Sequence, residues 1–154
     1  MNRPMRKQER RLSDEDTLEL LRQGEYGVLS MSTPENEGYG VPISYAYAGD
    51  AIYFHCATEG AKLDFLRAHP HASFCVVGKT EVLPAKFSTR FESAIAAGTI
   101  TEAAGDDKRK GLLLLVEKYS PDYLKEGKAY IDRAFDTVIV LKMNIESLTG
   151  KARK

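Results

Sequence analysis

The residues best suited to chemistry lie near the middle of the chain, where a lysine closely follows a histidine. His55 can gain or lose a proton near neutral pH, and Lys62 adds a positive charge seven positions later. Alternating side chains over positions 52–57 predict a strand with His55 on one face. Positions 61–68 read as a short helix that ends before Pro70. The segment therefore predicts a strand, a turn and a helix with Lys62 in its first turn.

This segment has two interpretations. The backbone N–H groups and the dipole of a helix N-terminus favour a phosphate, and Lys62 would supply the counter-charge of such an anion site. The alternative is an ordinary strand–turn–helix connection with a solvated lysine. His55 is likewise either an acid–base catalyst or a packed barrel histidine. The residue types and their spacing are compatible with either interpretation of the segment and with either role of His55.

Four potential metal ligands, Cys56, His69, His71 and Cys75, lie within twenty positions of one another. Their spacing matches no zinc framework, and a free buried cysteine usually behaves as a small hydrophobic residue. We therefore expect no metal. The glycines also form neither a dinucleotide fingerprint nor a Walker loop, and no Gly-x-Ser-x-Gly motif occurs.

The bulk composition predicts one globular domain over residues 1–154, with 43% hydrophobic and 29% charged residues. Lys plus Arg equals Asp plus Glu at 22 each, so no net field attracts nucleic acid or an anionic membrane. The longest aliphatic run, 112–116, is too short to cross a bilayer. Two cysteines fit a reducing cytoplasm. Positions 1–11 are rich in arginine and lysine, and no apolar segment of the kind found in secretory signals follows them. They therefore predict a flexible arm rather than a secretory signal.

The clearest alternation in the chain covers positions 39–48. Its bulky side chains share one face: Tyr39, Val41, Ile43, Tyr45 and Tyr47. Small side chains share the other: Gly40, Pro42, Ser44, Ala46 and Ala48. A bare strand face lets a flat ligand or another backbone approach closely, and proline predicts an edge strand or an interrupted one. Gly49 and Asp50 predict a tight hairpin into the next strand.

The remaining predicted elements are short helices and short strands, and most of the strands are expected to pair antiparallel. We expect a helix from a Ser13 cap to Gly24, strands at 27–32, 71–77, 90–102 (with a bulge at Gly98) and 137–143, a loop at 79–89, and helices from Asp106 or Asp107 to Tyr119 and from Ser120 to Asp132. Hairpins dominate this order. It predicts a mainly β fold, an antiparallel barrel with peripheral helices.

Several short motifs, in order and at matching spacing, resemble the nitroimidazole-resistance (Nim) group of the pyridoxamine-phosphate-oxidase-like FMN-binding split barrels. They are Gly-Val-Leu-Ser at 27–30, Val-Pro-Ile-Ser-Tyr at 41–45, Ile-Tyr-Phe-His-Cys-Ala at 52–57, Glu-Gly-Ala-Lys at 59–62, His-Pro at 69–70, Phe-Glu-Ser at 91–93 and Thr-Gly-Lys at 149–151. The resemblance covers positions 6–151. It implies an antiparallel split β-barrel, FMN-binding type, in a homodimer with FMN in the intersubunit cleft.

The resemblance also assigns residues to the FMN site. The strand over Val41, Pro42, Ile43, Ser44 and Tyr45 would lie along the isoalloxazine ring, its backbone paired with the pyrimidine edge. His55 and Cys56 would line the ribityl chain and the ring. Lys62 matches the phosphate-binding lysine, and Ser93 matches a polar flavin contact. Thr58 and Lys151 are further candidates near the phosphate.

Departures from the family pattern narrow the expected activity. The pyridoxamine phosphate oxidases have basic residues where this chain has Gly40 and Ala61, and the chain contains no tryptophan for their C-terminal substrate segment. We therefore do not expect oxidation of pyridoxamine phosphate. His55 matches the Nim histidine to which reductive activity is attributed, so the resemblance implies FMN-dependent reduction of a nitro group or another small acceptor. The alternative is a flavin- or haem-binding carrier, with His55 as an axial haem ligand.

Overall fold

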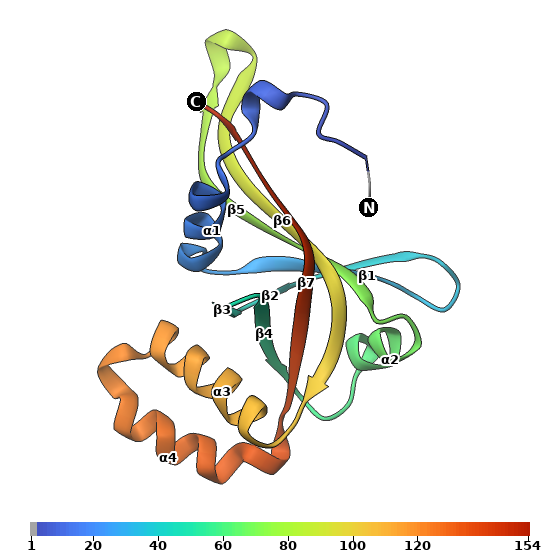
Figure 1. The fold of residues 1–154 in the computed structure, drawn as a ribbon, viewed down its shortest axis with the longest axis vertical. Coiled ribbons are helices and arrows are strands. Elements are labelled where there is room, and N and C mark those ends of the chain that lie inside the picture. Colours follow the sequence, from blue (N-terminus) through green and yellow to red (C-terminus); the bar gives the residue numbers. More distant parts are fainter. Residues whose placement is uncertain (1–2) are drawn as a thin grey trace.

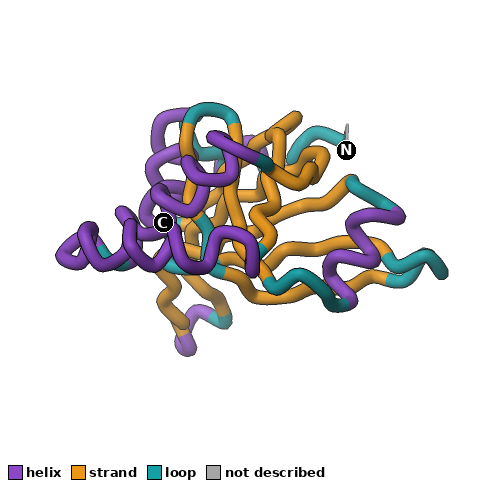
Figure 2. Tube along the Cα trace, turned by 90° about the horizontal axis from the view of Figure 1, so that it is seen from below, coloured by secondary structure: helices purple, strands orange, loops and turns teal. Residues whose placement is uncertain are grey.

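The computed structural model describes residues 3–154. In this part of the chain the helices are α1 (Asp14–Gln23), α2 (Ala61–Ala68), α3 (Gly105–Tyr119) and α4 (Leu124–Ala134), and the strands are β1 (Gly27–Ser32), β2 (Gly38–Ile43), β3 (Ala46–Ala48), β4 (Ala51–Cys56), β5 (His71–Leu83), β6 (Ser88–Ala103) and β7 (Ile139–Arg153). Every strand pair is antiparallel. Figure 2 shows strands at the centre and helices at the outside. The prediction of a mainly β fold with peripheral helices is confirmed.

The sheet is a split barrel because its two edge strands follow each other in the chain. Its order is β2-β1-β5-β6-β7-β4-β3, so β2 and β3 form opposite edges. Only Ser44 and Tyr45 separate these two strands. The sheet must therefore curl until both edges meet at these residues (Figure 1). We call Ser44 and Tyr45 the seam.

Two hydrophobic cores stabilise this arrangement. The first fills the barrel, where Phe74 contacts the rings of Tyr45 and Phe54 edge to face at centroid distances of 4.7 and 5.0 Å. The second lies between the outer face of the sheet and the helical pair α3–α4, and contains Tyr53 and Ile131 among its buried residues. The successive residues of β4 thus point into two different cores.

The strand predicted over 39–48 is broken at the seam. The small-residue face is exposed at Gly40, Pro42 and Ser44, as expected, but Ala46 is buried. The interruption comes at Tyr45, whose side chain enters the barrel and whose hydroxyl bonds the carbonyl of Leu21. The prediction that Pro42 lies on an edge strand is confirmed, because β2 forms one edge of the sheet.

The loop predicted over 79–89 is wrong. Strand β5 continues to Leu83, a 3-10 turn follows, and β6 begins at Ser88. Cross-strand pairs from Thr80↔Phe91 to Leu83↔Ser88 hold this extension, which we call the β5–β6 arm (residues 80–90). Glu81 and Arg90 add an exposed ion pair of 3.0 Å across it. The paired residues belong to one hairpin, but Pro84 indicated a loop and the turn signals did not predict that both strands continue so far.

The end of the sheet is also longer than predicted. Strand β7 continues past Met143 to Arg153 because its pairing with β6 runs from Val140 to Arg153, apart from the register shift near Gly98. The bulge predicted at Gly98 is confirmed by a register shift there. An added Cβ at this glycine would lie 1.9 Å from the carbonyl oxygen of Asn144, so the close strand approach requires glycine. The Asn144 amide also donates across β6, to the Thr99 carbonyl and the Thr101 hydroxyl, both at 3.4 Å.

Local signals located the first two helices well. Ser13 caps α1, its hydroxyl accepting from the Asp16 N–H at 3.0 Å, and α2 has its predicted bounds. Helix α3 differs: its N-cap is Ala104, and the predicted caps lie in the first turn. The predicted arm covers residues 1–11, of which residues 1 and 2 lie outside the described residues. At its end the backbone of Arg11 forms an isolated antiparallel β-bridge with Lys151. Flexibility of the arm stays a prediction.

Candidate functional site

The β4–α2 connection brings His55, Cys56 and Lys62 together. His55 is exposed to solvent on one side, but partial burial among its neighbours lowers its pKa below the usual 6.5, and the Lys62 ammonium lowers it further. Burial raises the pKa of the Cys56 thiol, and the same ammonium opposes that rise. Lys62 is therefore close enough to act on both side chains. At neutral pH the site holds a neutral imidazole, a neutral thiol and a cation.

The start of α2 fits an anion. Its N-cap is Gly60, which offers no side chain to accept from the first N–H groups of the helix. The N–H groups of Leu63 and Asp64 already donate to the Gly60 carbonyl, at 3.1 and 3.2 Å, so the N–H groups of Ala61 and Lys62 are the donors that an anion at this helix start could use. Gly60 itself has a φ of 139°, a conformation that side-chain-bearing residues rarely adopt. The donor set thus suits a phosphate group better than a neutral ligand.

A pocket of about 460 Å³ lies beside His55. Two of its residues, Ser44 and His55, belong to the predicted site. The others belong to α3 and α4 or lie directly after one of these helices: Leu112, Leu115, Val116, Tyr119, Ser120, Tyr130, Ile131, Ala134 and Val138. The lining is mostly apolar and contains no carboxylate, lysine or arginine. Its size and chemistry suit an uncharged small molecule.

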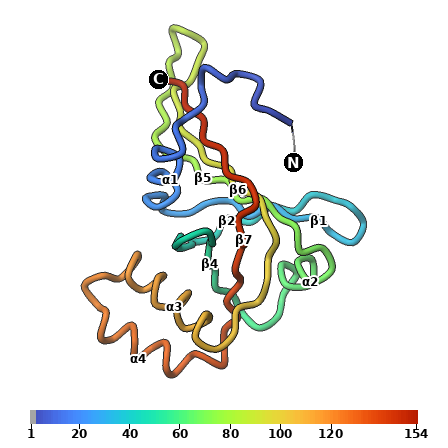
Figure 3. Tube along the Cα trace, viewed as in Figure 1, coloured from blue at the N-terminus to red at the C-terminus, as the bar shows by residue number. Residues whose placement is uncertain are grey.

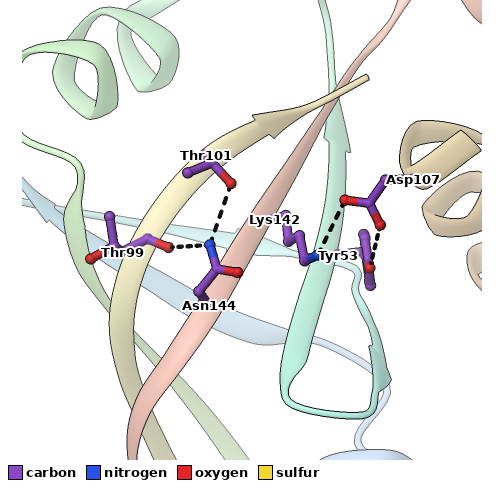
Figure 4. A network of polar contacts seen from close by, with 6 residues as sticks. All are labelled: Tyr53, Thr99, Thr101, Asp107, Lys142 and Asn144. Carbon is purple, nitrogen blue, oxygen red and sulfur yellow. Dashed lines mark hydrogen bonds and ion pairs between the residues drawn. The ribbon is translucent and has the colours of Figure 1, made fainter. Parts of the chain in front are cut away.

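Helix α3 is fixed to the sheet at both of its ends. At its start the carboxylate of Asp107 accepts from the Tyr53 hydroxyl at 2.8 Å and from the Lys142 ammonium at 3.2 Å (Figure 4). At its end the Tyr119 hydroxyl accepts from the backbone N–H of Tyr45 at 3.0 Å. The same hydroxyl lies 2.6 Å from the Glu25 carbonyl oxygen, to which it donates. Tyr119 therefore holds the seam in place while it lines the pocket.

A buried amine lies behind the seam. The Nζ atom of Lys118 sits over the ring of Tyr45, 3.6 Å from its centroid, and makes no hydrogen bond to the described residues. Burial lowers the pKa of Lys118 to about 8. Burial also raises the pKa of Tyr45, and the neighbouring Tyr119 adds to the rise. The cation–π contact is thus this amine's main favourable interaction.

A sequence profile of the pyridoxamine 5′-phosphate oxidase family matches residues 13–152. The chain belongs to this family. A search of curated proteins gave no match.

Many solved structures share the fold of this family member. One is a candidate 5-nitroimidazole antibiotic resistance protein from Bacteroides thetaiotaomicron, with 23% identity, a TM-score of 0.81 and coverage of 92% of this chain and 86% of that chain. An FAD- and haem-binding protein from Mycobacterium smegmatis has 22% identity, a TM-score of 0.79 and coverage of 92% and 72%. An FAD-binding protein from Mesorhizobium loti has 20% identity, a TM-score of 0.66 and coverage of 94% and 98%.

The predicted ring contacts at residues 41–45, on β2 and the seam, divide into three kinds in this pyridoxamine 5′-phosphate oxidase family member. Pro42 and Ser44 are exposed and open to a ligand. Val41 and Ile43 are half-buried and pack against the barrel core. Tyr45 is fully buried, so only its backbone could meet a ligand, and Tyr119 already engages that backbone.

Ser93 does not lie near Lys62 within one chain. Helix α2 packs over the part of β6 that contains Thr101, and Arg67 of α2 forms a 2.6 Å ion pair with the next residue, Glu102. Ser93 lies eight residues earlier on the same strand, about 26 Å away at the rise of a β-strand. Lys151 pairs with Ser93 and is equally distant. Of the predicted contacts, these two stand apart from the rest.

Sequence reasoning missed the helical side of the pocket. A signal was present: Leu112, Leu115, Val116 and Tyr119 follow the i, i+3, i+4, i+7 spacing of one helix face. That spacing indicates a buried face but does not say against which strand it packs. The contribution of Tyr119 therefore depended on tertiary structure.

Two negative findings concern residues 3–154. No group of three or more His, Cys, Asp or Glu side chains is placed to hold a metal ion there. None of the helices described in this range combines the length and apolar character needed to cross a membrane.

Proposed function

We propose that this protein is an FMN-dependent oxidoreductase that reduces a nitro group or another small acceptor. The observation that carries the proposal is the juxtaposition of a phosphate-compatible helix start, bearing Lys62, with an apolar pocket that has His55 on its wall. A cofactor phosphate and an uncharged acceptor would thus find complementary surfaces close together on the β4–α2 segment. When bound, FMN would supply the transfer of electron pairs to the acceptor.

The residues of the chain have separate tasks in this proposal. Lys62 and the first N–H groups of α2 bind the phosphate. The exposed residues Pro42 of β2 and Ser44 of the seam line the ring, and the apolar pocket excludes water around the acceptor. His55 orients the acceptor or delivers a proton from an imidazole nitrogen. Similarity to the Bacteroides candidate resistance protein supports a nitro compound as the acceptor class.

A homodimer is part of the proposal. Ser93 lies about 26 Å along β6 from the part of the strand next to α2, so both contacts belong to one FMN site only if a second copy supplies Ser93. Light scattering coupled to size-exclusion chromatography tests this. A monomer that retains FMN would contradict it.

The test of the function begins with the absorption spectrum of the purified protein and mass spectrometry of the released ligand. Flavin bands and released FMN are expected. Anaerobic reduction of a 5-nitroimidazole is then compared between the wild type and His55→Ala. A variant that binds FMN normally and reduces the acceptor at the wild-type rate would remove the role of His55. A protein that is colourless and refuses added FMN would remove the proposal.

A non-catalytic carrier of flavin or haem is the second candidate. It is favoured by the neutral imidazole of His55 on the pocket wall, since a neutral ring nitrogen can ligate haem iron. The similar Mycobacterium smegmatis protein binds FAD and haem. A haem Soret band without flavin bands in the purified protein would favour this candidate over the first.

A further inference from the structure

The side-chain amine of Lys118 is enclosed by the protein without a hydrogen bond to any of residues 3–154. Its Nζ atom lies 3.6 Å from the centroid of the Tyr45 ring and 5.2 Å from that of the Tyr119 ring. Helix α3 brings the amine there, because the end of this helix reaches the seam and the residues that follow α1 (Figure 3). A buried amine without a hydrogen-bond partner is costly and calls for an explanation.

No carboxylate offsets the charge of Lys118 in the described part of the chain. The lysine takes part in none of the ion pairs found there, and burial alone lowers its pKa, to about 8. The titratable groups that face it are two phenols, Tyr45 from the seam and Tyr119 from its own helix. At neutral pH the amine is therefore mostly an unpaired ammonium. Because an apolar side chain of similar length would fill the same space at lower cost, packing does not account for a lysine here.

The pocket beside the seam lacks what Lys118 has to offer. Ser44 and Tyr119 line this pocket, but its wall contains no lysine or arginine. In the proposed function FMN lies along Ser44, and the flavin ring gains negative charge when it is reduced. That charge would face an apolar wall unless a cation lay behind it. Lys118 supplies such a cation, since its amine contacts Tyr45, the neighbour of Ser44 in the seam.

We propose that the Lys118 ammonium stabilises the reduced form of FMN through the seam. The inference rests on the proposed function and adds a residue that sets how readily the bound flavin accepts electrons. A hydride donor passes two electrons and one proton to the ring, which changes from neutral to singly negative. At neutral pH Lys118 keeps its proton and forms no bond in this step. Opposite charges attract more strongly in the protein interior than in water, so the reduced state gains more than the oxidised state.

The midpoint potential of bound FMN, measured by equilibration with a reference dye, tests this role. Lys118→Met removes the buried charge, and Lys125→Met, at an exposed site on α4, is the matched control. Fluorescence titration first gives the affinity of each protein for oxidised FMN, so that all potentials are measured at full occupancy. We expect Lys118→Met to shift the potential to more negative values, and to weaken the binding of reduced FMN several-fold more than that of oxidised FMN. Lys125→Met should keep the wild-type potential.

The pH dependence of the potential separates charge from packing. Because the amine titrates near pH 8, the difference between the wild type and Lys118→Met should be complete below this pH and shrink above it. The wild type alone should also show a change. Its potential should fall more steeply with pH just above 8, since reduction then draws an extra proton to the amine.

Three outcomes overturn the inference and leave the proposed function in place. In the first, Lys118→Met binds FMN and its potential equals that of the wild type. In the second, Lys125→Met shifts the potential equally, so that general charge is responsible. In the third, the shift in Lys118→Met does not change with pH and reflects packing. A wild type that binds no FMN would instead remove both the inference and the proposed function.

Discussion

The two faces of β4 meet different environments, although they alternate along six residues. Ile52 and Phe54 point into the barrel, where aromatic rings contact one another and the core residues are fully buried. Tyr53 points the other way and is covered by α3, but two residues later His55 meets a pocket instead of a side chain. The barrel is thus packed to specify the fold, whereas the helical layer covers only part of the outer face. The space that it leaves is where a ligand can bind.

The largest expected effect comes from opening a cavity in the barrel. Phe74→Ala should lower the free energy of unfolding by about 3–5 kcal/mol, since the ring is fully buried between Tyr45 and Phe54. Ile131→Ala, in the helical layer, should cost about 2 kcal/mol, because the adjoining pocket already interrupts the packing. Urea unfolding followed by circular dichroism measures both. Equal losses would contradict the difference between the two cores.

A change at the ligand side should affect binding and leave stability nearly unchanged. Lys62→Met should weaken FMN binding by about 10- to 100-fold, the value of a charge-assisted hydrogen bond. Arg67→Met is the matched control: it removes one charge from the same helix, but this arginine already pairs with Glu102. Fluorescence titration of FMN gives both affinities. An equal loss in the two variants would mean that general charge, not a phosphate contact, is responsible.

Local signals were enough to predict elements whose ends are set by their own residues. The Ser13 cap and the bounds of α2 follow from capping and from proline. The seam was not predictable, because the break at Tyr45 depends on Leu21 and Tyr119, 24 and 74 positions away. The arm was missed for a different reason: Pro84 suggests a loop, whereas the pairs from Thr80↔Phe91 to Leu83↔Ser88 continue both strands up to a short turn.

The candidate site divides in the same way. His55, Cys56 and Lys62 are close in sequence, and the structure brings them together. The pocket wall is assembled from helices more than fifty residues later, which no local spacing could assign to His55. The resemblance also assigns Ser93 to the site, but within one chain this residue lies about 26 Å along β6 from the part of the strand next to α2. Sequence thus predicted which residues of the β4–α2 segment lie together, but not the helices that line the apolar pocket.

The join between the two layers can be tested at Tyr119. Tyr119→Phe keeps the ring but leaves the buried N–H of Tyr45 without its acceptor, so the free energy of unfolding should fall by about 1–3 kcal/mol. FMN affinity should fall as well, because the seam is no longer held. Tyr123→Phe, an exposed tyrosine at the start of α4, is the control and should change neither quantity. A Tyr119→Phe protein with unchanged stability would show that the seam does not depend on this hydroxyl.

The lowered pKa of His55 predicts opposite pH dependences for activity and stability. If the imidazolium delivers the proton, acceptor reduction should accelerate as the pH falls below 6.5 through the folded-state pKa. Stability should change the other way. Its contribution from His55 is complete above 6.5, the unfolded value, and declines as the pH falls, because the unfolded chain binds the proton more readily. His55→Gln should remove both trends. If either trend persists in that variant, another group causes it.

The smallest effect concerns the amine behind the seam. Lys118→Met should raise the free energy of unfolding at pH 7 by about 1 kcal/mol, because it replaces a buried ammonium without hydrogen bonds by an apolar chain of similar length. The folded-state pKa is about 8 and the unfolded value is 10.5. Between these values only the unfolded chain keeps the proton, so the wild type gains stability with pH and the advantage of the variant should shrink. A pH-independent advantage would point to packing instead of charge. A loss at pH 7 would show that the contact with Tyr45 outweighs burial, making the amine a stabilising part of the boundary between the barrel and the helical layer.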